Sequence, residues 1–145
     1  MRLTLYSDYA LRTLMFLAIK GETLSTVQEI AGTYEISSNH LMKLVTDLGR
    51  AGIIETVRGR NGGMRLAMAP EDINIGALVR RTEDDSQHVE CFDAATNNCR
   101  ITASCKLRHK LREALDAYYA VLDEVTLADL VARPQPLRRS LAIGV

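Results

Sequence analysis

The 145-residue sequence predicts a mainly α-helical chain, built as a winged helix-turn-helix, a cysteine-bearing loop and a long helix. Three observations predict this fold class. Capped apolar runs of helical period fill the first fifty residues, and a glycine-rich hairpin follows them. A longer run of helical period comes after the cysteines, and a hydrophobic content of 47% is enough to bury a core.

The first two helices are predicted from the residues at their ends. Ser7 can cap a helix that runs to about residue 20, where Gly21 provides a stop. Ser25 and Thr26 each stand three residues before a glutamine or a glutamate, which is the spacing of a capping box. We therefore expect an apolar first helix and a short second helix that ends near Tyr34.

A third helix and a hairpin complete the winged helix-turn-helix. Ser37 or Ser38 can cap the third helix. Its apolar residues recur at helical spacing: Leu41, Leu44, Val45 and Leu48. A connection of three or four residues between the second and third helices gives the helix-turn-helix outline. Two β-prone runs, 53–57 and 64–68, flank a loop that contains Asn61-Gly62, a strong indicator of a hairpin.

A short helix, a loop, a long helix and a last short helix are predicted in the second half of the chain. Pro70 ends the hairpin, and a helix over residues 73–81 leads into an acidic stretch, Glu83, Asp84 and Asp85. After the cysteines, an apolar seam at intervals of three or four residues predicts a long helix: Leu107, Leu111, Leu115, Tyr118, Leu122 and Val125. Thr126 and Asp129 cap the last helix.

These elements divide the chain into four regions. Residues 1–82 form the winged helix-turn-helix domain, and residues 83–105 form the cysteine-bearing loop. Residues 106–132 contain the long helix and the short helix after it, and residues 133–145 form a tail that we expect to be poorly ordered. No stretch has the pattern of a signal peptide or the length of a membrane span, so we expect a cytoplasmic protein with no membrane contact.

The winged helix-turn-helix has the chemistry of a DNA-binding surface. The formal net charge is zero, yet residues 36–65 carry five lysines and arginines against two acidic residues. The third helix would meet base edges and phosphates in the major groove, and the hairpin tip would reach phosphates or the minor groove. The candidate contacts are Ser37, Ser38, Asn39, His40, Lys43, Arg58, Arg60, Asn61 and Arg65. The alternative for the hairpin is a solvated charged turn.

The long helix predicts a homodimer. One monomer offers a small footprint on double-stranded operator DNA, and two copies would place two half-sites about one helical turn apart. The seam is longer than a domain of about 70 residues would need to cover. The alternative is that this helix packs against its own domain.

All three cysteines, Cys91, Cys99 and Cys105, fall within one fifteen-residue segment. In a reducing compartment this clustering favours a metal centre or a redox switch over a disulfide framework. Three thiolates suit zinc or an iron-sulfur cluster, and they leave one coordination position for a different ligand. His88 lies near Cys91 in the sequence, although a lone histidine in a loop is more often solvated. The residue types alone do not distinguish zinc from a cluster.

Three stretches of the chain resemble one family of bacterial regulators. They are residues 57–66 of the hairpin, the opening residues 1–4 and residues 127–131. They resemble the winged-helix iron-sulfur regulators that include NsrR, IscR and RirA, and the resemblance extends over about residues 1–136. Residues 99–107 are most similar to the NsrR branch, whose members are repressors that sense nitric oxide.

This resemblance implies a homodimeric repressor that releases operator DNA when nitric oxide nitrosylates its iron-sulfur cluster. The alternative is an iron-availability regulator of the RirA type, which shares the wide gap between Cys91 and Cys99. We expect no enzymatic activity, because the sequence has no Cys-x-x-Cys, no phosphate-binding glycine motif and no Ser/His/Asp arrangement.

The resemblance also implies a ligand set. The three cysteines would hold the cluster, which we expect to be 4Fe-4S, with 2Fe-2S as the alternative. NsrR-type proteins take a fourth ligand from an aspartate near the start of the other subunit's first helix, and Asp8 stands at the matching position. The structural alternative for Asp8 is an ion pair with Arg12 at the favourable end of the helix dipole. IscR-type proteins use a histidine at the position of Arg108, and here His109 is one residue further on.

Overall fold

The computed structural model describes residues 3–83 and 88–144. The helices are α1 (Leu5–Lys20), α2 (Val27–Tyr34), α3 (Ser38–Arg50), α4 (Ile75–Thr82), α5 (Lys106–Asp123), α6 (Leu127–Leu130) and α7 (Pro134–Ser140). Strands β1 (Ile54–Val57) and β2 (Gly63–Leu66) pair antiparallel, and 3-10 turns lie at Pro70–Asp72 (η1), Glu90–Phe92 (η3) and Thr102–Ser104 (η4). The predicted mainly α-helical fold with one hairpin is confirmed. Met1, Arg2, Asp84 and Asp85 lie outside the described residues.

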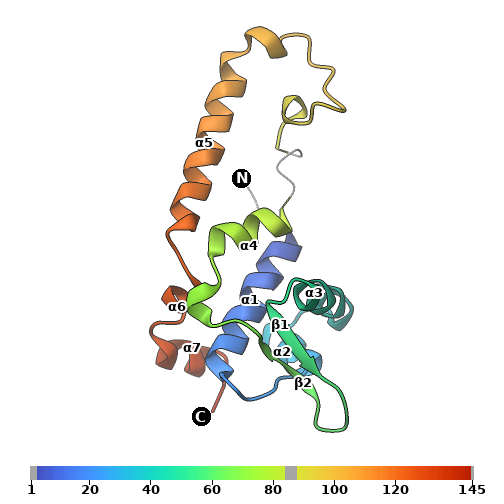
Figure 1. Cartoon of the computed structure of the whole chain (residues 1–145), viewed down its shortest axis with the longest axis vertical. Coiled ribbons are helices and arrows are strands. Elements are labelled where there is room, and N and C mark those ends of the chain that lie inside the picture. Colours follow the sequence, from blue (N-terminus) through green and yellow to red (C-terminus); the bar gives the residue numbers. More distant parts are fainter. Residues whose placement is uncertain (1–2, 84–87, 145) are drawn as a thin grey trace.

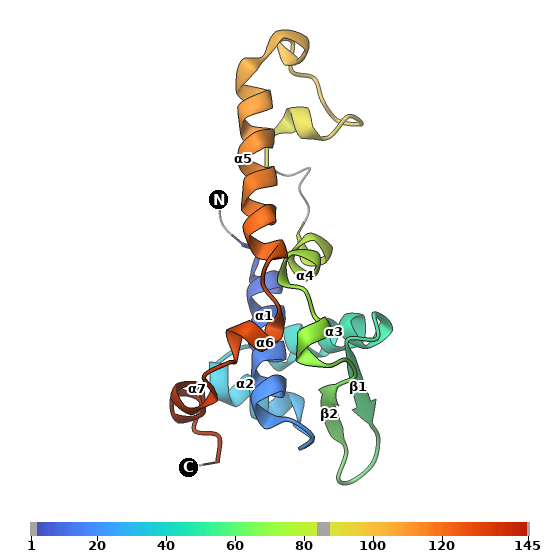
Figure 2. The same ribbon diagram turned by 60° about the vertical axis from the view of Figure 1, so that its left-hand side comes forward.

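The elements form a base and a stalk (Figure 1). In the base, α1 is surrounded by the hairpin, α3, α4, α6 and α7. The stalk is α5, and the segment that contains the cysteines lies beside α5 and at its outer end (Figure 2). The hairpin tip and the outer end of the stalk therefore lie at opposite ends of the molecule. Within residues 3–83 and 88–144, every helix is too short or too polar to cross a lipid bilayer.

Helix α1 is the centre of the core, and it begins earlier than the sequence predicts. Thr4 caps this helix, because its Oγ1 accepts a hydrogen bond of 3.2 Å from the amide of Ser7. The prediction of Ser7 as the cap was wrong. Ser7 is completely buried in the first turn, and its hydroxyl donates to Thr82 Oγ1 of α4 at 2.7 Å. The predicted stop at Gly21 is confirmed, since this residue has a φ of 63°.

The helix-turn-helix and the hairpin are joined at the start of α2. Thr26 caps α2 as predicted, and the other candidate, Ser25, instead pairs its backbone with Met64 of β2 at 2.9 and 2.8 Å. A side chain at Gly63 would place its Cβ 2.8 Å from the carbonyl oxygen of Ser25. Only glycine allows this approach, which fixes the base of the hairpin against the second helix. The strands are shorter than predicted, and residues 58–62 form the tip.

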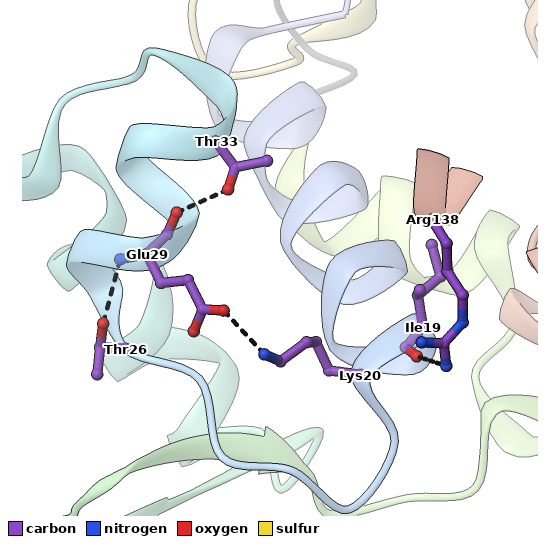
Figure 3. A network of polar contacts seen from close by, with 6 residues as sticks. All are labelled: Ile19, Lys20, Thr26, Glu29, Thr33 and Arg138. Atoms are coloured by element: carbon purple, nitrogen blue, oxygen red, sulfur yellow. Dashed lines mark hydrogen bonds and ion pairs between the residues drawn. The ribbon is translucent and has the colours of Figure 1, made fainter. Parts of the chain in front are cut away.

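The end of the chain is a docked helix rather than the poorly ordered tail that we expected. Pro134 begins α7, where a missing amide hydrogen costs no helical hydrogen bond. Arg138 donates to the carbonyl oxygen of Ile19 at 2.7 Å (Figure 3). Ile143, near the end of the chain, is 8% exposed. In the same region Lys20 forms an ion pair of 2.8 Å with Glu29. The last turn of α1 is therefore tied to both α2 and α7.

The stalk is anchored to the base where α4 meets the end of α5. Arg80 and Asp123 form a bidentate ion pair, and Asn74 donates to the carbonyl oxygen of Asp123 at 2.7 Å. The hydrogen bond from Arg80 lowers the pKa of the Asp123 carboxyl group. The guanidinium of Arg80 also lies 4.3 Å from the ring centroid of Tyr119. These contacts join α5 to the helix that packs on the start of α1.

Candidate DNA-binding face and cysteine centre

Helix α3 buries one side in the core and presents the other side to solvent. The buried residues are the four that were predicted from helical spacing: Leu41, Leu44, Val45 and Leu48. The exposed candidate contacts on or next to this helix are Ser37, Asn39, His40 and Lys43. Ser37 precedes the helix without a capping hydrogen bond from its side chain, and Ser38 is half-buried. The first turns of α3 thus leave polar groups available for an outside partner.

The hairpin tip presents two further exposed cations. Arg58, Arg60 and Asn61 are all exposed, and Gly59 between the arginines has a φ of 115°, which favours glycine. Among the described residues, Arg58, Arg60 and Lys43 have no ion pair. The local surplus of positive charge seen in the sequence therefore consists of side chains that are open to an anionic partner.

Arg65 differs from the other candidate contacts because its guanidinium is already occupied. It pairs with Glu55 across the hairpin and with Glu22 at 3.3 Å. The hydrogen bond with Glu55 raises the pKa of Arg65 further. These contacts hold β2 against β1 and the loop after α1, so Arg65 is less available to a DNA phosphate than Lys43, Arg58 and Arg60.

The first turn of α1 is bonded to both α3 and the end of α4. The hydroxyl of Tyr6 donates to Asp47 Oδ2 of α3 at 2.6 Å. Burial of the hydroxyl is the larger cause, and this hydrogen bond the second, of a rise in the pKa of Tyr6 to about 12. The amide of Thr4 donates to Glu83 at 2.8 Å. This role of Tyr6 was not predicted, because a contact between residues 41 positions apart leaves no local pattern in the sequence.

The three cysteines lie on the segment at the outer end of the stalk. Cys91 lies in η3, Cys99 lies in the following loop, and Cys105 is the N-cap of α5. All three are free and partly buried. The amide of Arg108 donates to Cys105 Sγ at 3.4 Å, and its Nε donates to the carbonyl oxygen of Cys91 at 3.2 Å. Arg108 therefore holds the first and last cysteines to the same turn of α5.

The donor set has the chemistry of a thiophilic metal centre, although the sulfur atoms do not converge in this conformation. In residues 3–83 and 88–144, no three His, Cys, Asp or Glu side chains are close enough to hold a metal ion. Three partly buried thiols that form no disulfide are nevertheless the soft ligands that an iron-sulfur cluster requires. The loop also gives Cys99 fixed backbone contacts, since Thr102 Oγ1 donates to its carbonyl oxygen at 2.7 Å.

The candidates for a fourth ligand lie in different places. Asp8 forms the ion pair with Arg12 that was considered from the sequence, with N–O distances of 2.8 and 2.9 Å. It is in the first turn of α1 in the base, whereas the cysteines of the same chain lie along the stalk (Figure 1). Arg108 occupies the position of the IscR-type histidine, and it donates hydrogen bonds to Cys105 and Cys91. His109 and His88 are exposed, and His88 lines a largely apolar hollow of about 380 Å³.

The predicted seam of α5 is covered at one end and open at the other. Leu115 and Tyr119 are buried, and α5 packs on α4. Of the seam residues near the outer end, Leu107 is 64% exposed and Leu111 is 37% exposed, and Val121, which lies outside the predicted seam, is 66% exposed. Packing against the chain's own domain therefore accounts for only part of the seam, and an apolar strip on the stalk remains uncovered.

Comparison with known proteins identifies the family. Residues 3–133 match the Rrf2 family, described as an iron-dependent transcriptional regulator. The chain belongs to the Rrf2 family. It is 57% identical over 143 residues to the HTH-type transcriptional regulator NsrR of Bacillus subtilis, and the match covers 97% of each chain. The family and the NsrR resemblance predicted from the hairpin and cysteine segments are confirmed.

Solved structures of Rrf2 regulators have the same fold. The structure of CymR, the global cysteine regulator of B. subtilis, gives a TM-score of 0.68 at 29% identity over 91% of this chain and 97% of that chain. The structure of IscR of T. potens gives a TM-score of 0.67 at 28% identity, over 91% of this chain and 87% of that chain. These matches confirm the winged-helix fold class. The chain is thus an Rrf2-family transcriptional regulator rather than an enzyme, as predicted.

Proposed function

We propose that this Rrf2 regulator is a homodimeric iron-sulfur repressor that releases operator DNA in response to nitric oxide. One observation supports it best: a winged helix whose Lys43, Arg58 and Arg60 have no ion pair with any described residue is joined through α5 to three free cysteines. The proposal fits the name of its B. subtilis relative, NsrR. It assigns the protein to the cytoplasm, where its DNA partner lies.

The DNA contacts are proposed on the open face of α3 and the hairpin tip. Ser37, Ser38, Asn39, His40 and Lys43 would meet the major groove, and Arg58, Arg60 and Asn61 would meet phosphates or the minor groove. The absence of competing ion pairs at Lys43, Arg58 and Arg60, within the part of the chain that the structure describes, supports this assignment. Each phosphate contact adds to the salt dependence of binding.

The second copy of the chain is proposed to cover the open strip of α5. Leu107, Leu111 and Val121 are large apolar side chains on the stalk that the chain's own domain leaves exposed. Two stalks packed together would remove this surface from water. The pairing would also place two winged helices on adjacent half-sites, as double-stranded operator recognition requires.

Cys91, Cys99 and Cys105 would hold the cluster, most simply as 4Fe-4S, with Asp8 of the partner subunit as the fourth ligand. When bound, the cluster would supply iron that nitric oxide attacks. A carboxylate is a hard ligand that suits thiophilic iron poorly, so Asp8 is the ligand most easily lost. Asp8 forms an ion pair with Arg12 of its own helix, and this pair would compete with binding of its carboxylate to iron.

The first turn of α1 can transmit the state of Asp8 to the DNA-reading helix. Tyr6 is two residues before Asp8 and is hydrogen bonded to Asp47 of α3. The same turn is bonded to the end of α4 through Ser7 and Thr82. A shift of Asp8 would therefore move α3 and α4 together, and about 3 kcal/mol of such coupling changes occupancy about a hundredfold.

Tyr6→Phe is expected to reduce the ratio of operator affinities between cluster-loaded and cluster-free protein about tenfold. Phenylalanine keeps the ring but removes a hydrogen bond to a charged group, which is worth about 1.5 kcal/mol. Fluorescence anisotropy with labelled operator measures both affinities. Tyr34→Phe is the matched control, because it removes a hydrogen bond of 3.1 Å between α2 and the Arg12 carbonyl. An unchanged ratio in Tyr6→Phe would exclude this route.

Titration of anaerobically purified protein tests the function itself. Nitric oxide is expected to change the visible absorbance and to release operator DNA at the same stoichiometry. The description of the family as iron-dependent favours one alternative, an iron-availability regulator. In that case an iron chelator alone would release the DNA, and nitric oxide at cluster stoichiometry would leave it bound.

A further inference from the structure

Helix α3 exposes one large apolar side chain in the middle of an otherwise polar surface. Met42 is 52% exposed, and the other exposed members of this stripe follow helical spacing: Asn39, Lys43, Thr46 and Arg50. The stripe lies opposite the buried leucines of the same helix. Met42 was not predicted to contact DNA, because the candidate contacts were polar and charged residues.

Thr46 extends the apolar character of this position. Its hydroxyl donates to the carbonyl oxygen of Met42, one turn earlier in the same helix, at 2.8 Å. The hydroxyl is therefore satisfied within α3, and the methyl group is the part of the side chain without a polar partner. Met42 and the Thr46 methyl form a small apolar patch between Asn39 at one end and Arg50 at the other.

We infer that Met42 reads thymine in the operator, through contact with the C5-methyl groups in the major groove. This inference rests on the proposed DNA-binding function of α3. The thymine methyl is the apolar group that distinguishes base pairs in the major groove, and it is read by apolar side chains. Methionine suits such a contact, because its thioether is polarisable and its unbranched chain adapts to the surface that it meets.

The surroundings of Met42 favour DNA over a second protein surface. Lys43 on the same helix and Arg58 and Arg60 on the hairpin tip are exposed cations of the kind that bind DNA phosphates. The apolar strip of α5 proposed for the second copy lies on the stalk, and α3 lies in the base (Figure 2). Met42 is thus placed to select thymine at base pairs that face the middle of α3.

The test replaces single thymines by deoxyuridine, which removes only the methyl group. A duplex is first selected from random DNA with the cluster-loaded wild-type dimer, and each thymine is then substituted in turn. At one or two positions in each half-site, wild-type binding is expected to weaken about fourfold, the effect of one buried methyl group. With Met42→Ala, thymine and deoxyuridine at those positions should bind equally.

Three variants make the result specific to the side chain. Met42→Leu, which remains apolar, is expected to retain the preference for thymine, and Met42→Gln, of similar length but polar, is expected to lose it. Met68→Ala is the matched control, since Met68 is 36% exposed but lies after the hairpin, outside α3. Equal thymine preference in wild type and Met42→Ala at every position, with sequence-specific binding retained, would overturn this inference alone. If the wild-type dimer bound no DNA sequence specifically, both the proposed function and this inference would be overturned.

Discussion

Cys105→Ser is expected to abolish the visible absorbance of the cluster in anaerobically purified protein while leaving α5 folded. Cys105 has two roles that the serine variant separates. It is a proposed cluster ligand, and its Sγ accepts the amide of Arg108 as the N-cap of α5. Serine is a good N-cap, but its hydroxyl is a hard and weakly acidic ligand for iron. Because the cluster is lost, operator affinity should fall about a hundredfold relative to the cluster-loaded wild type.

Cys105→Ala is the companion variant that separates capping from ligation. It should also lack the cluster, and its cluster-free form should unfold with a free energy about 1 kcal/mol lower than that of Cys105→Ser, because the cap is lost. Urea denaturation followed by circular dichroism measures this difference. Cys91→Ala and Cys99→Ala should lose the absorbance without a capping effect, since neither cysteine caps α5. Full retention of the absorbance in any of these variants would remove that cysteine from the ligand set.

The parts of the fold that the sequence predicted well depend on neighbours in the chain. The capping box of Thr126 and Asp129 forms as expected, and Thr26 caps α2. In both cases the donor and acceptor are three residues apart, so the spacing alone defines the contact. The buried face of α3 follows from helical period in the same way.

The parts that the sequence did not predict depend on contacts between distant segments. Ser7 has the right residue type for a cap, but packing of α1 on α4 buries it and leaves the cap to Thr4. The tail is docked on the base because Arg138 reaches the carbonyl of Ile19, which is 119 positions away. Neither contact has a local pattern, because each depends on how the whole base packs.

The candidate site shows the same division between residue type and arrangement. The cysteine segment and the exposed cations are visible in the sequence because their residue types define the chemistry. Arg65 was grouped with those cations, and only the folded hairpin shows that Glu55 and Glu22 occupy it. Met42 was missed because the candidate DNA contacts were chosen among polar and charged residues, and it was not among the apolar residues expected in the core.

Asp8→Ala is expected to keep the cluster but to reduce the response of DNA binding to nitric oxide. Three thiolates remain to hold the cluster, whereas the bond that ties the site to α1 of the partner subunit is lost. The ratio of operator affinities before and after nitric oxide treatment should fall from about a hundredfold to threefold or less. Absorbance spectra and anisotropy titrations on the same anaerobic samples measure the two effects together.

Arg12→Ala provides the control for the Asp8 variant. Removing Arg12 breaks the same ion pair but leaves the carboxylate free to act as a ligand. The pair is partly exposed, with side chains 44% and 36% accessible, so its loss should change the free energy of unfolding by less than about 1 kcal/mol. Arg12→Ala should therefore retain a large nitric oxide response. If Asp8→Ala retained it as well, the carboxylate would have no part in coupling the cluster to α3.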